Sequence, residues 1–168
     1  MGTQLESRQV YSATPQQVMA MLKDPDYITE RATVTGALTV THTRTDDADG
    51  TVNLVIMRTL PADMPSYARS IVGDTLTITE HQTWKAAPDG DYQGSFDVKF
   101  SAPLTFKGRV IMTVDGTSTT VVTTGEFKAA VPFVGGKVER LALEQTERYL
   151  RKEEEIARDW LAHKAEPA

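Results

Sequence analysis

Hydrophobic residues recur at helical spacing over one long stretch near the C-terminal end of the chain. After the pair Gly135-Gly136, a single row of side chains returns every three or four residues, which predicts one helix over about 136–163. At 1.5 Å per residue, this helix is roughly 40 Å long. The row comprises Val138, Leu141, Ala142, Gln145, Tyr149, Ile156 and Trp160. A mainly apolar row of this length needs a surface to pack against.

The preceding part of the chain, from Gly36 to Pro132, alternates between apolar and polar residues and is punctuated by turn signals. A similar run at 4–12 lies near the N-terminus. Turns are predicted at 46–50 and 88–91, and Asp115-Gly116 predicts a type I′ hairpin turn. The pattern predicts about seven strands, over 4–12, 37–45, 51–60, 75–86, 92–100, 104–114 and 118–129.

Two short helices are predicted between the first and second strands. Thr14 is a suitable N-cap, Pro15 suits the first helical position, and Gln17 completes a capping box. The first helix should end at Asp24, because a residue before proline avoids the helical region. A second helix is predicted over about 26–32, and residues 66–72 predict one or two further helical turns.

The order of these elements predicts an α+β fold. The sheet is the one large surface on which the terminal helix can pack, so we expect a curved antiparallel sheet of about seven strands to grip that helix. Such an arrangement tends to enclose an apolar cavity. The chain contains no linker, repeat or low-complexity stretch, and we expect a single domain over residues 1–168.

Composition narrows the classes of function. The net charge of -5 argues against nucleic acid and anionic membrane surfaces, since both favour a basic patch. The absence of cysteine excludes thiolate chemistry and disulfides. No apolar run reaches the roughly 20 residues of a membrane helix, and no signal-peptide core is present. We therefore expect a cytoplasmic protein with no integral membrane segment.

Several motifs fail when their spacing is tested. Gly136-Lys137 suggests a phosphate loop, but Val131 and Val138 occupy its other required positions. The acidic turn at 46–50 lacks both terminal ligands of a calcium loop, where Thr45 and Ile56 stand instead. The three histidines lack metal-ligand spacing, and no nucleophile elbow is present. We expect no metal, cofactor or assignable catalytic residue.

Four polar residues fall on strand faces that are otherwise apolar. Counting along the strands places His42, Arg58, Glu80 and Gln82 there. Polar groups on such a face need partners or water. Strand twist can bring them out at the sheet rim. Alternatively, Arg58 and Glu80 form an internal ion pair and His42 forms a polar wall of a pocket.

The order of a strand, two short helices, six strands and a long helix resembles the START/Bet v 1-like helix-grip superfamily, also called SRPBCC. Residues 131–161, together with Thr83-Trp84 and Pro61…Pro65, resemble a mostly actinobacterial family within it, DUF2505. The resemblance implies a hydrophobic cavity between sheet and helix that holds lipids, sterols, polyketides or plant hormones. It also implies that some members are cyclases or dehydratases and that others bind proteins.

Our first hypothesis is a carrier or sensor that binds an apolar or amphipathic small molecule between sheet and helix. Burial of apolar ligand surface would drive binding. The expected cavity residues are Val40, His42, Leu54, Ile56, Arg58, Ile78, Glu80, Trp84, Phe96, Val98, Phe106, Val110, Val138, Leu141, Leu143, Gln145 and Tyr149.

Two alternatives remain open at this point. The first is a cyclase or dehydratase that acts on a polyketide-like substrate, which needs a general acid or base in the cavity. Glu80 and His42 are the candidates for that role. The second is an interaction module whose cavity is filled by its own side chains. It would dock a partner through the run Glu153-Glu154-Glu155, although such a run is more often a solvated face.

Overall fold

One seven-stranded antiparallel sheet forms the body of the protein in the computed structural model, which describes residues 2–88 and 90–165, apart from the side chains of 164 and 165. The order of the strands across the sheet is β1-β7-β6-β5-β4-β3-β2. The strands are β1 (Thr3–Tyr11), β2 (Thr39–Asp46), β3 (Val52–Pro61), β4 (Thr75–Ala86), β5 (Tyr92–Phe100), β6 (Leu104–Asp115) and β7 (Ser118–Ala129).

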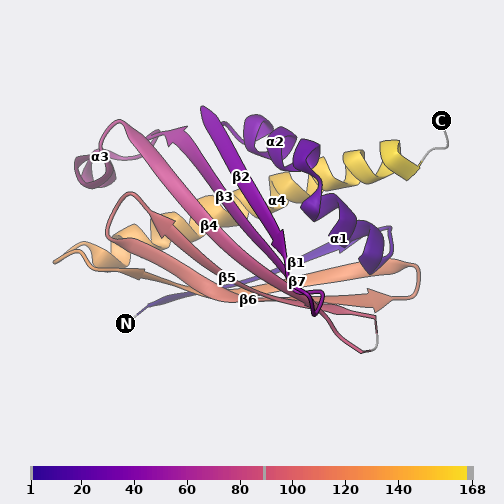
Figure 1. Ribbon diagram of the computed structural model, residues 1–168. Coiled ribbons are helices and arrows are strands. Elements are labelled where there is room, and N and C mark those ends of the chain that lie inside the picture. The colour runs from indigo at the N-terminus through magenta and orange to yellow at the C-terminus, as the bar shows by residue number, and fades with distance from the viewer. Residues whose placement is uncertain (1, 89, 166–168) are drawn as a thin grey trace.

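Four helices accompany the sheet. Two of them, α1 and α2, lie together toward one end of the sheet, and α3 lies at the opposite end (Figure 1). The long helix α4 runs along the sheet between these two ends (Figure 1). The bounds are α1 (Pro15–Lys23), α2 (Pro25–Val34), α3 (Ser66–Val72) and α4 (Gly135–Ala165). This confirms the predicted α+β helix-grip architecture.

The predicted helix ends are present. Thr14 accepts a hydrogen bond from the backbone N–H of Gln17, whose side chain accepts one from the Thr14 backbone in return. Asp24 ends α1 and caps α2, because its side chain accepts a hydrogen bond from the Asp26 backbone. Local capping chemistry therefore sets the boundary between the two helices.

The prediction for the β6–β7 hairpin was wrong by one residue. Asp115 pairs with Ser118, so the two loop residues are Gly116 and Thr117, not Asp115 and Gly116. Gly116 has φ 63°, whereas Thr117 is not in the positive-φ region. A positive φ at the first loop position alone is typical of a type II′ turn, which takes glycine there. The other predicted turn, at 88–91, includes Asp89, which lies outside the described residues.

A pair of glycines lets aromatic rings lie directly on the sheet. Gly108 and Gly125 face each other across β6 and β7. A Cβ on Gly108 would collide with the carbonyl oxygen of Thr124, so no side chain fits there. The ring of Phe106 stacks on that of Phe127, with centroids 4.0 Å apart. This stack is the centre of one hydrophobic core, which is made of Leu5, Ile78, Phe96, Val98, Leu104, Phe106 and Phe127.

A second hydrophobic core lies under α1, α2 and the C-terminal half of α4. Tyr27 and Trp160 meet edge to face in it, with ring centroids 5.5 Å apart. Strands β1, β3, β4, β6 and β7 each contribute side chains to its floor. Its buried members include Val18, Met19, Met21, Tyr27, Ile28, Leu54, Ile56, Met112, Ile156 and Ala157.

Hydrogen bonds that carboxylates of α4 accept fasten the helix to the side of the sheet that β1 and β7 form. Glu139 is 4% exposed and accepts hydrogen bonds from Thr3 Oγ1 and the Ala129 N–H, both at 2.8 Å. Near the other end of the helix, Glu154 accepts a hydrogen bond at 2.8 Å from the N–H of Val10 in the edge strand β1. These contacts hold the helix along one side of the sheet and satisfy buried or edge polar groups.

A buried ion pair ties α2 to α4. Arg31 Nη1 lies 3.2 Å from Glu153 Oε2, and the two side chains are only 5% and 12% exposed. Gln9 Nε2 donates to Glu153 Oε1 and to the carbonyl oxygen of Leu150. Burial lowers the pKa of Arg31, but the nearby Tyr149 and Glu153, together with Tyr27 and Glu80, hold that pKa above its ordinary value. Arg31 therefore keeps its charge, and each member of the pair depends on the other for a partner.

We predict that Glu153→Ala lowers the free energy of unfolding by about 3–5 kcal/mol, because it leaves the Arg31 guanidinium buried without its anion. Urea denaturation followed by circular dichroism measures this change. Glu155→Ala is the matched control, since the Glu155 side chain is 65% exposed and pairs only with Lys152 among the described residues. A loss for Glu153→Ala no larger than that for Glu155→Ala would contradict the anchoring role.

We also predict that Gly108→Ala lowers the free energy of unfolding by about 2–3 kcal/mol, because the added methyl group collides with the β7 backbone. Gly136→Ala is the control with the same change, since its methyl group would meet nothing closer than 3.7 Å in α4. The control should keep or slightly raise stability. Equal thermal denaturation midpoints for the two variants would contradict the close approach at Gly108.

Candidate functional site

A cavity of about 530 Å³ lies between the inner face of the sheet and α4. Strands β3 to β6 form most of one wall, α4 forms the other, and residues of α3 and of the neighbouring loops line one end. The wall is mainly apolar and includes Leu60, Leu76, Ile78, Phe96, Val98, Phe100, Leu104, Phe106, Val110, Val138, Leu141, Ala142 and Leu150.

The attachment of α4 explains why space remains there. The helix makes its close contacts with β1 and β7 on the sheet and with α1 and α2. Along α4, Val138, Leu141, Ala142 and Tyr149 are only partly buried, although they point toward the sheet and line the cavity. Part of their accessible surface therefore faces the cavity. The helix row that the sequence predicted as a packing face is, in its N-terminal half, largely a cavity wall.

A row of polar side chains crosses this apolar wall. Trp84 Nε1 donates to Gln82 Oε1 at 2.9 Å, and Gln82 Nε2 donates to Glu80 Oε2. Glu80 Oε1 lies 3.9 Å from Arg58 Nη1. Arg58 Nη1 donates in turn to the hydroxyl oxygen of Tyr149 on α4, at 3.3 Å. The row therefore links two strands to the helix across the cavity.

Arg58 is held in the cavity by several weak contacts. Its side chain is 11% exposed, and its guanidinium carbon lies 4.7 Å from the centre of the Tyr149 ring, a cation–π distance. Its Nε is buried and has no hydrogen-bond partner among the described protein atoms. Burial raises the pKa of Tyr149, although Arg31 and Arg58 partly offset it, so the hydroxyl keeps its proton near neutral pH.

A second group of polar residues, which the sequence did not reveal, also lines the cavity. Arg31, Glu153, Gln9 and Tyr11 all contribute to the wall. Burial raises the pKa of Tyr11, and the Glu153 carboxylate adds to the shift. The sequence did carry a signal for one of these residues. Arg31 lies on the same face of α2 as Tyr27, Ile28 and Ala32, and all four are buried.

The structure brings most of the predicted cavity residues together around this one space. The predicted residues found on the wall are Arg58, Ile78, Glu80, Trp84, Phe96, Val98, Phe106, Val110, Val138, Leu141, Gln145 and Tyr149. That they contact a ligand stays a prediction.

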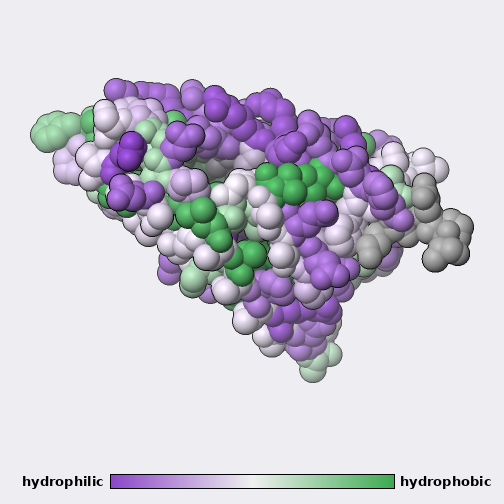
Figure 2. Space-filling view, turned by 90° about the horizontal axis from the view of Figure 1, so that it is seen from above, coloured by the Kyte–Doolittle hydropathy of each residue, from purple (hydrophilic) through white to green (hydrophobic). Residues whose placement is uncertain are grey.

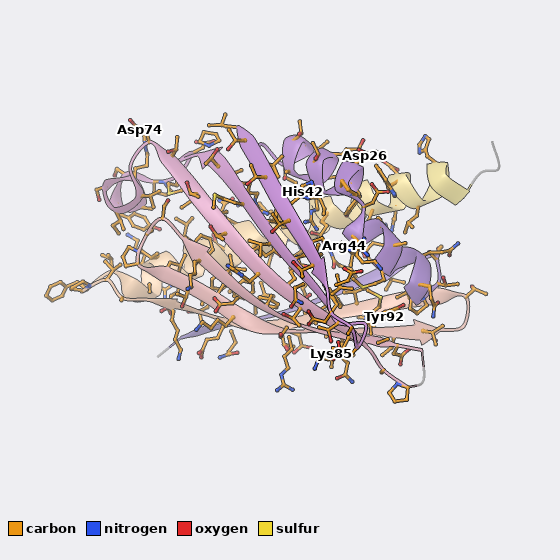
Figure 3. The ribbon with its side chains drawn as sticks, in the orientation of Figure 1. Asp26, His42, Arg44, Asp74, Lys85 and Tyr92 are labelled. Atoms are coloured by element: carbon orange, nitrogen blue, oxygen red, sulfur yellow. The ribbon has the colours of Figure 1, made fainter. Side chains whose placement is uncertain are left out.

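The remaining predicted residues lie elsewhere. Leu54 and Ile56 are fully buried in the core under α1 and α2, and Val40 packs against that core. Leu143 packs against the core around the Phe106–Phe127 stack. His42 is partly buried on the edge strand β2, near α2, and is not among the wall residues (Figure 3). The two helices fill the space over that end of the sheet, which the strand pattern alone does not reveal.

The acidic run on α4 is mostly engaged within the protein. Glu153 pairs with Arg31, and Glu154 binds the Val10 backbone and lies 3.5 Å from Arg158. Only Glu155 has a mainly exposed side chain, and Lys152 lies 3.3 Å from it. The expectation of a solvated face therefore holds for one of these three residues, and the run offers little charge to a partner.

The large apolar side chains that the described residues expose do not gather at one place on the surface. The face shown in Figure 2 is hydrophilic over much of its area, with a few apolar patches near its middle. The large exposed apolar side chains are distributed over several elements and loops: Val10, Val34, Leu38, Met57, Ile111, Val114 and Phe133. Such scattered exposure is ordinary for a folded protein.

The described ranges contain neither a candidate metal cluster nor a helix suited to cross a membrane. No group of three or more His, Asp or Glu side chains there is arranged to hold a metal ion. None of the helices in those ranges combines the length and the hydropathy that crossing a bilayer requires. Of the two acid–base candidates, Glu80 faces the cavity and His42 does not.

Several solved structures share this fold at low sequence identity. The norcoclaurine synthase of Thalictrum flavum, a point mutant in complex with a transition-state analogue, has a TM-score of 0.65 and 8% identity, with 99% of this chain and 98% of that chain covered. The Zhui aromatase/cyclase of Streptomyces sp. R1128 has a TM-score of 0.64 and 14% identity, with 99% and 97% covered. A STAR-related lipid transfer protein of Xanthomonas axonopodis has a TM-score of 0.59 and 15% identity, with 95% and 85% covered.

At these identities the likeness shows the fold alone, and the named activities belong to those proteins. No curated protein sequence matches the chain. The family model described as "Protein of unknown function (DUF2505)" matches residues 6–161, which is nearly the whole chain. The chain therefore belongs to the DUF2505 family and has the START/Bet v 1-like fold that its sequence resembles.

Proposed function

We propose that this protein binds a hydrophobic or amphipathic small molecule, lipid-like or polyketide-like, in the cavity between the sheet and α4. The observation that carries the proposal is the cavity itself, at about 530 Å³ with mainly apolar walls. Small-molecule sites are typically concave and apolar, with volumes of roughly 300–1,000 Å³ and a few placed polar groups. Burial of ligand surface, at roughly 25 cal/mol per Å², supplies the driving force.

The polar row gives the ligand an orientation. Arg58 and Tyr149 lie in the row, and Gln145 lines the same helix wall. The rest of the cavity lining is mainly apolar, so a ligand gains most of its binding energy from apolar contact and its direction from these groups. Two of the structural neighbours are a lipid transfer protein and an aromatase/cyclase, which is consistent with an occupant of either chemical type.

The enzyme alternative has weaker support. Glu80 lies on the cavity wall, but Gln82 donates to one of its oxygens and Arg58 stands near the other. A carboxylate held in this way suits the positioning of Arg58 better than proton transfer to a ligand. We therefore favour binding over catalysis.

We predict that a noncovalently bound apolar molecule is retained by the protein when it is purified from its own cells and examined by native mass spectrometry. We further predict that the neutral dye Nile red binds the emptied protein. Ala142→Trp places a large ring in the cavity and should weaken dye binding at least about tenfold, which corresponds to 1.4 kcal/mol.

Glu144→Trp is the matched control, because Glu144 is exposed on the same helix. It should bind the dye as the wild-type protein does. The proposal fails if the wild-type protein neither retains a molecule nor binds the dye, or if Ala142→Trp folds and binds the dye with unchanged affinity.

A further inference from the structure

We propose that Arg58 and Tyr149 together form a site for a neutral acceptor oxygen of the ligand, such as the carbonyl oxygen of a ketone or ester. This inference rests on the proposed function, because it names the chemical class of molecule that the cavity takes. The apolar body of the ligand would lie against the side chains beside this pair, among them Ile78, Val98 and Leu141.

The first observation is an unsatisfied donor on Arg58. Its Nε is buried on the cavity wall and has no hydrogen-bond partner among the described protein atoms. Buried N–H groups are nearly always paired, so this unpaired atom marks a guanidinium whose hydrogen-bonding capacity the protein does not fully use. Nη2 of the same group makes no hydrogen bond within the described residues and is not among their fully buried atoms, so it is the donor of Arg58 that a molecule in the cavity can reach.

The second observation is a donor on Tyr149 beside it. The Tyr149 hydroxyl oxygen accepts from Arg58 Nη1 at 3.3 Å. Its own O–H makes no hydrogen bond to any acceptor in the described part of the chain. A carbonyl oxygen has two lone pairs and can accept from two donors at once. Arg58 and Tyr149 therefore present two neighbouring donors to one ligand oxygen.

The third observation is that the ion pair of Arg58 is loose. The distance of 3.9 Å between Arg58 Nη1 and Glu80 Oε1 is longer than a hydrogen bond, whereas Arg31 and Glu153 approach to 3.2 Å. Glu80 also accepts from Gln82. The guanidinium is thus balanced in charge but not saturated in hydrogen bonds, which leaves it able to donate to a ligand.

The charges on the wall favour a neutral acceptor over a carboxylate. The described wall carries two guanidiniums, Arg31 and Arg58, and three carboxylates, Asp63, Glu80 and Glu153. Two positive and three negative charges leave a formal charge of -1. A ligand carboxylate would add a further negative charge in a mainly apolar space, which is unfavourable. A carbonyl group uses both donors without that penalty.

The test compares three probes with one skeleton: 2-acetonaphthone, 2-ethylnaphthalene and 2-naphthoate, which carry a ketone, a hydrocarbon group and a carboxylate. Each is titrated against Nile red bound to the wild-type protein at neutral pH. We expect the ketone to bind about tenfold more tightly than the hydrocarbon, as a hydrogen bond from a charged donor allows. We expect the carboxylate to bind more weakly than the ketone.

The decisive variant is the double change Arg58→Met and Glu80→Gln. It removes the buried cation and its anion together, so that neither charge is left alone. We expect Nile red to stay bound and the preference for ketone over hydrocarbon to fall to about one. Arg148→Met is the control for the arginine change, since Arg148 is exposed on α4 beside Tyr149, and it should keep the wild-type preference.

Tyr149→Phe removes the second donor and should reduce the ketone preference by about threefold, the effect of one neutral hydrogen bond. Equal binding of ketone and hydrocarbon by the wild-type protein overturns the inference, as does a ketone preference that survives in the double variant. Tighter binding of 2-naphthoate than of the ketone would show that the site prefers a charged group, and it overturns the claim that the acceptor is neutral. Failure of the wild-type protein to bind Nile red or any probe counts instead against the proposed function.

Discussion

The one-sided attachment of α4 to the sheet is the constraint on which the rest of the structure depends. Glu139 fastens the start of the helix to β1 and β7, and Glu153 with Arg31 fastens its later turns to α2. These carboxylates are buried and satisfied, so a displacement of the helix toward the sheet centre would break several charged contacts at once. The helix is thereby held along one edge, and β3 to β6 face open space.

The helix and the sheet do not close onto this space, because packed cores on either side of it hold them in place. The Phe106–Phe127 stack packs on one part of the sheet, and the core around Tyr27 and Trp160 packs on another. Protein interiors are normally packed close to crystal density, so a hollow of this size between two packed cores is a departure from the ordinary pattern. Departures from local packing rules are expected where a protein binds its ligand.

The polar row on the cavity wall is a second departure of the same kind. Arg58, Glu80 and Gln82 stand on strand faces that otherwise carry Leu, Ile and Trp, and they satisfy one another only in part. A row selected for stability alone would be apolar or fully hydrogen-bonded. The incompletely hydrogen-bonded Arg58 guanidinium is therefore the feature on which the proposed ligand site rests.

Much of the fold could be predicted from the sequence, because strand alternation, the Thr14 capping box and the Asp24-Pro25 break are local signals. Strand periodicity placed Arg58 and Glu80 on an apolar face in the same way, but left open whether they turn out at the sheet rim or form an internal pair. Leu54 and Ile56 share that periodicity and yet belong to a packed core. Only the placement of α1 and α2 over their end of the sheet separates the two environments.

Arg31 and Glu153 could not be predicted as a pair for a related reason. Each lies within the inward row of its own helix, but the partner is 122 residues away in the chain, and a charged residue in a mixed helix is usually solvated. The error at the β6–β7 hairpin is smaller. A shift of one residue in the strand pairing replaces the predicted type I′ turn with a turn that begins at Gly116. Long-range contacts, not local propensity, decided what the sequence left open.

Methyl chemical shifts test most directly whether a small molecule occupies the cavity between the sheet and α4, since they report separately on the cavity and on the packed core. The protein, with labelled Ile, Leu and Val methyl groups, is titrated with 2-acetonaphthone. The account predicts shift changes at the cavity-wall residues Leu76, Ile78, Val98 and Leu141, while Leu54 and Ile56, equally internal but in the core, stay unchanged. Shifts confined to surface methyl groups, or equal at wall and core, would contradict it.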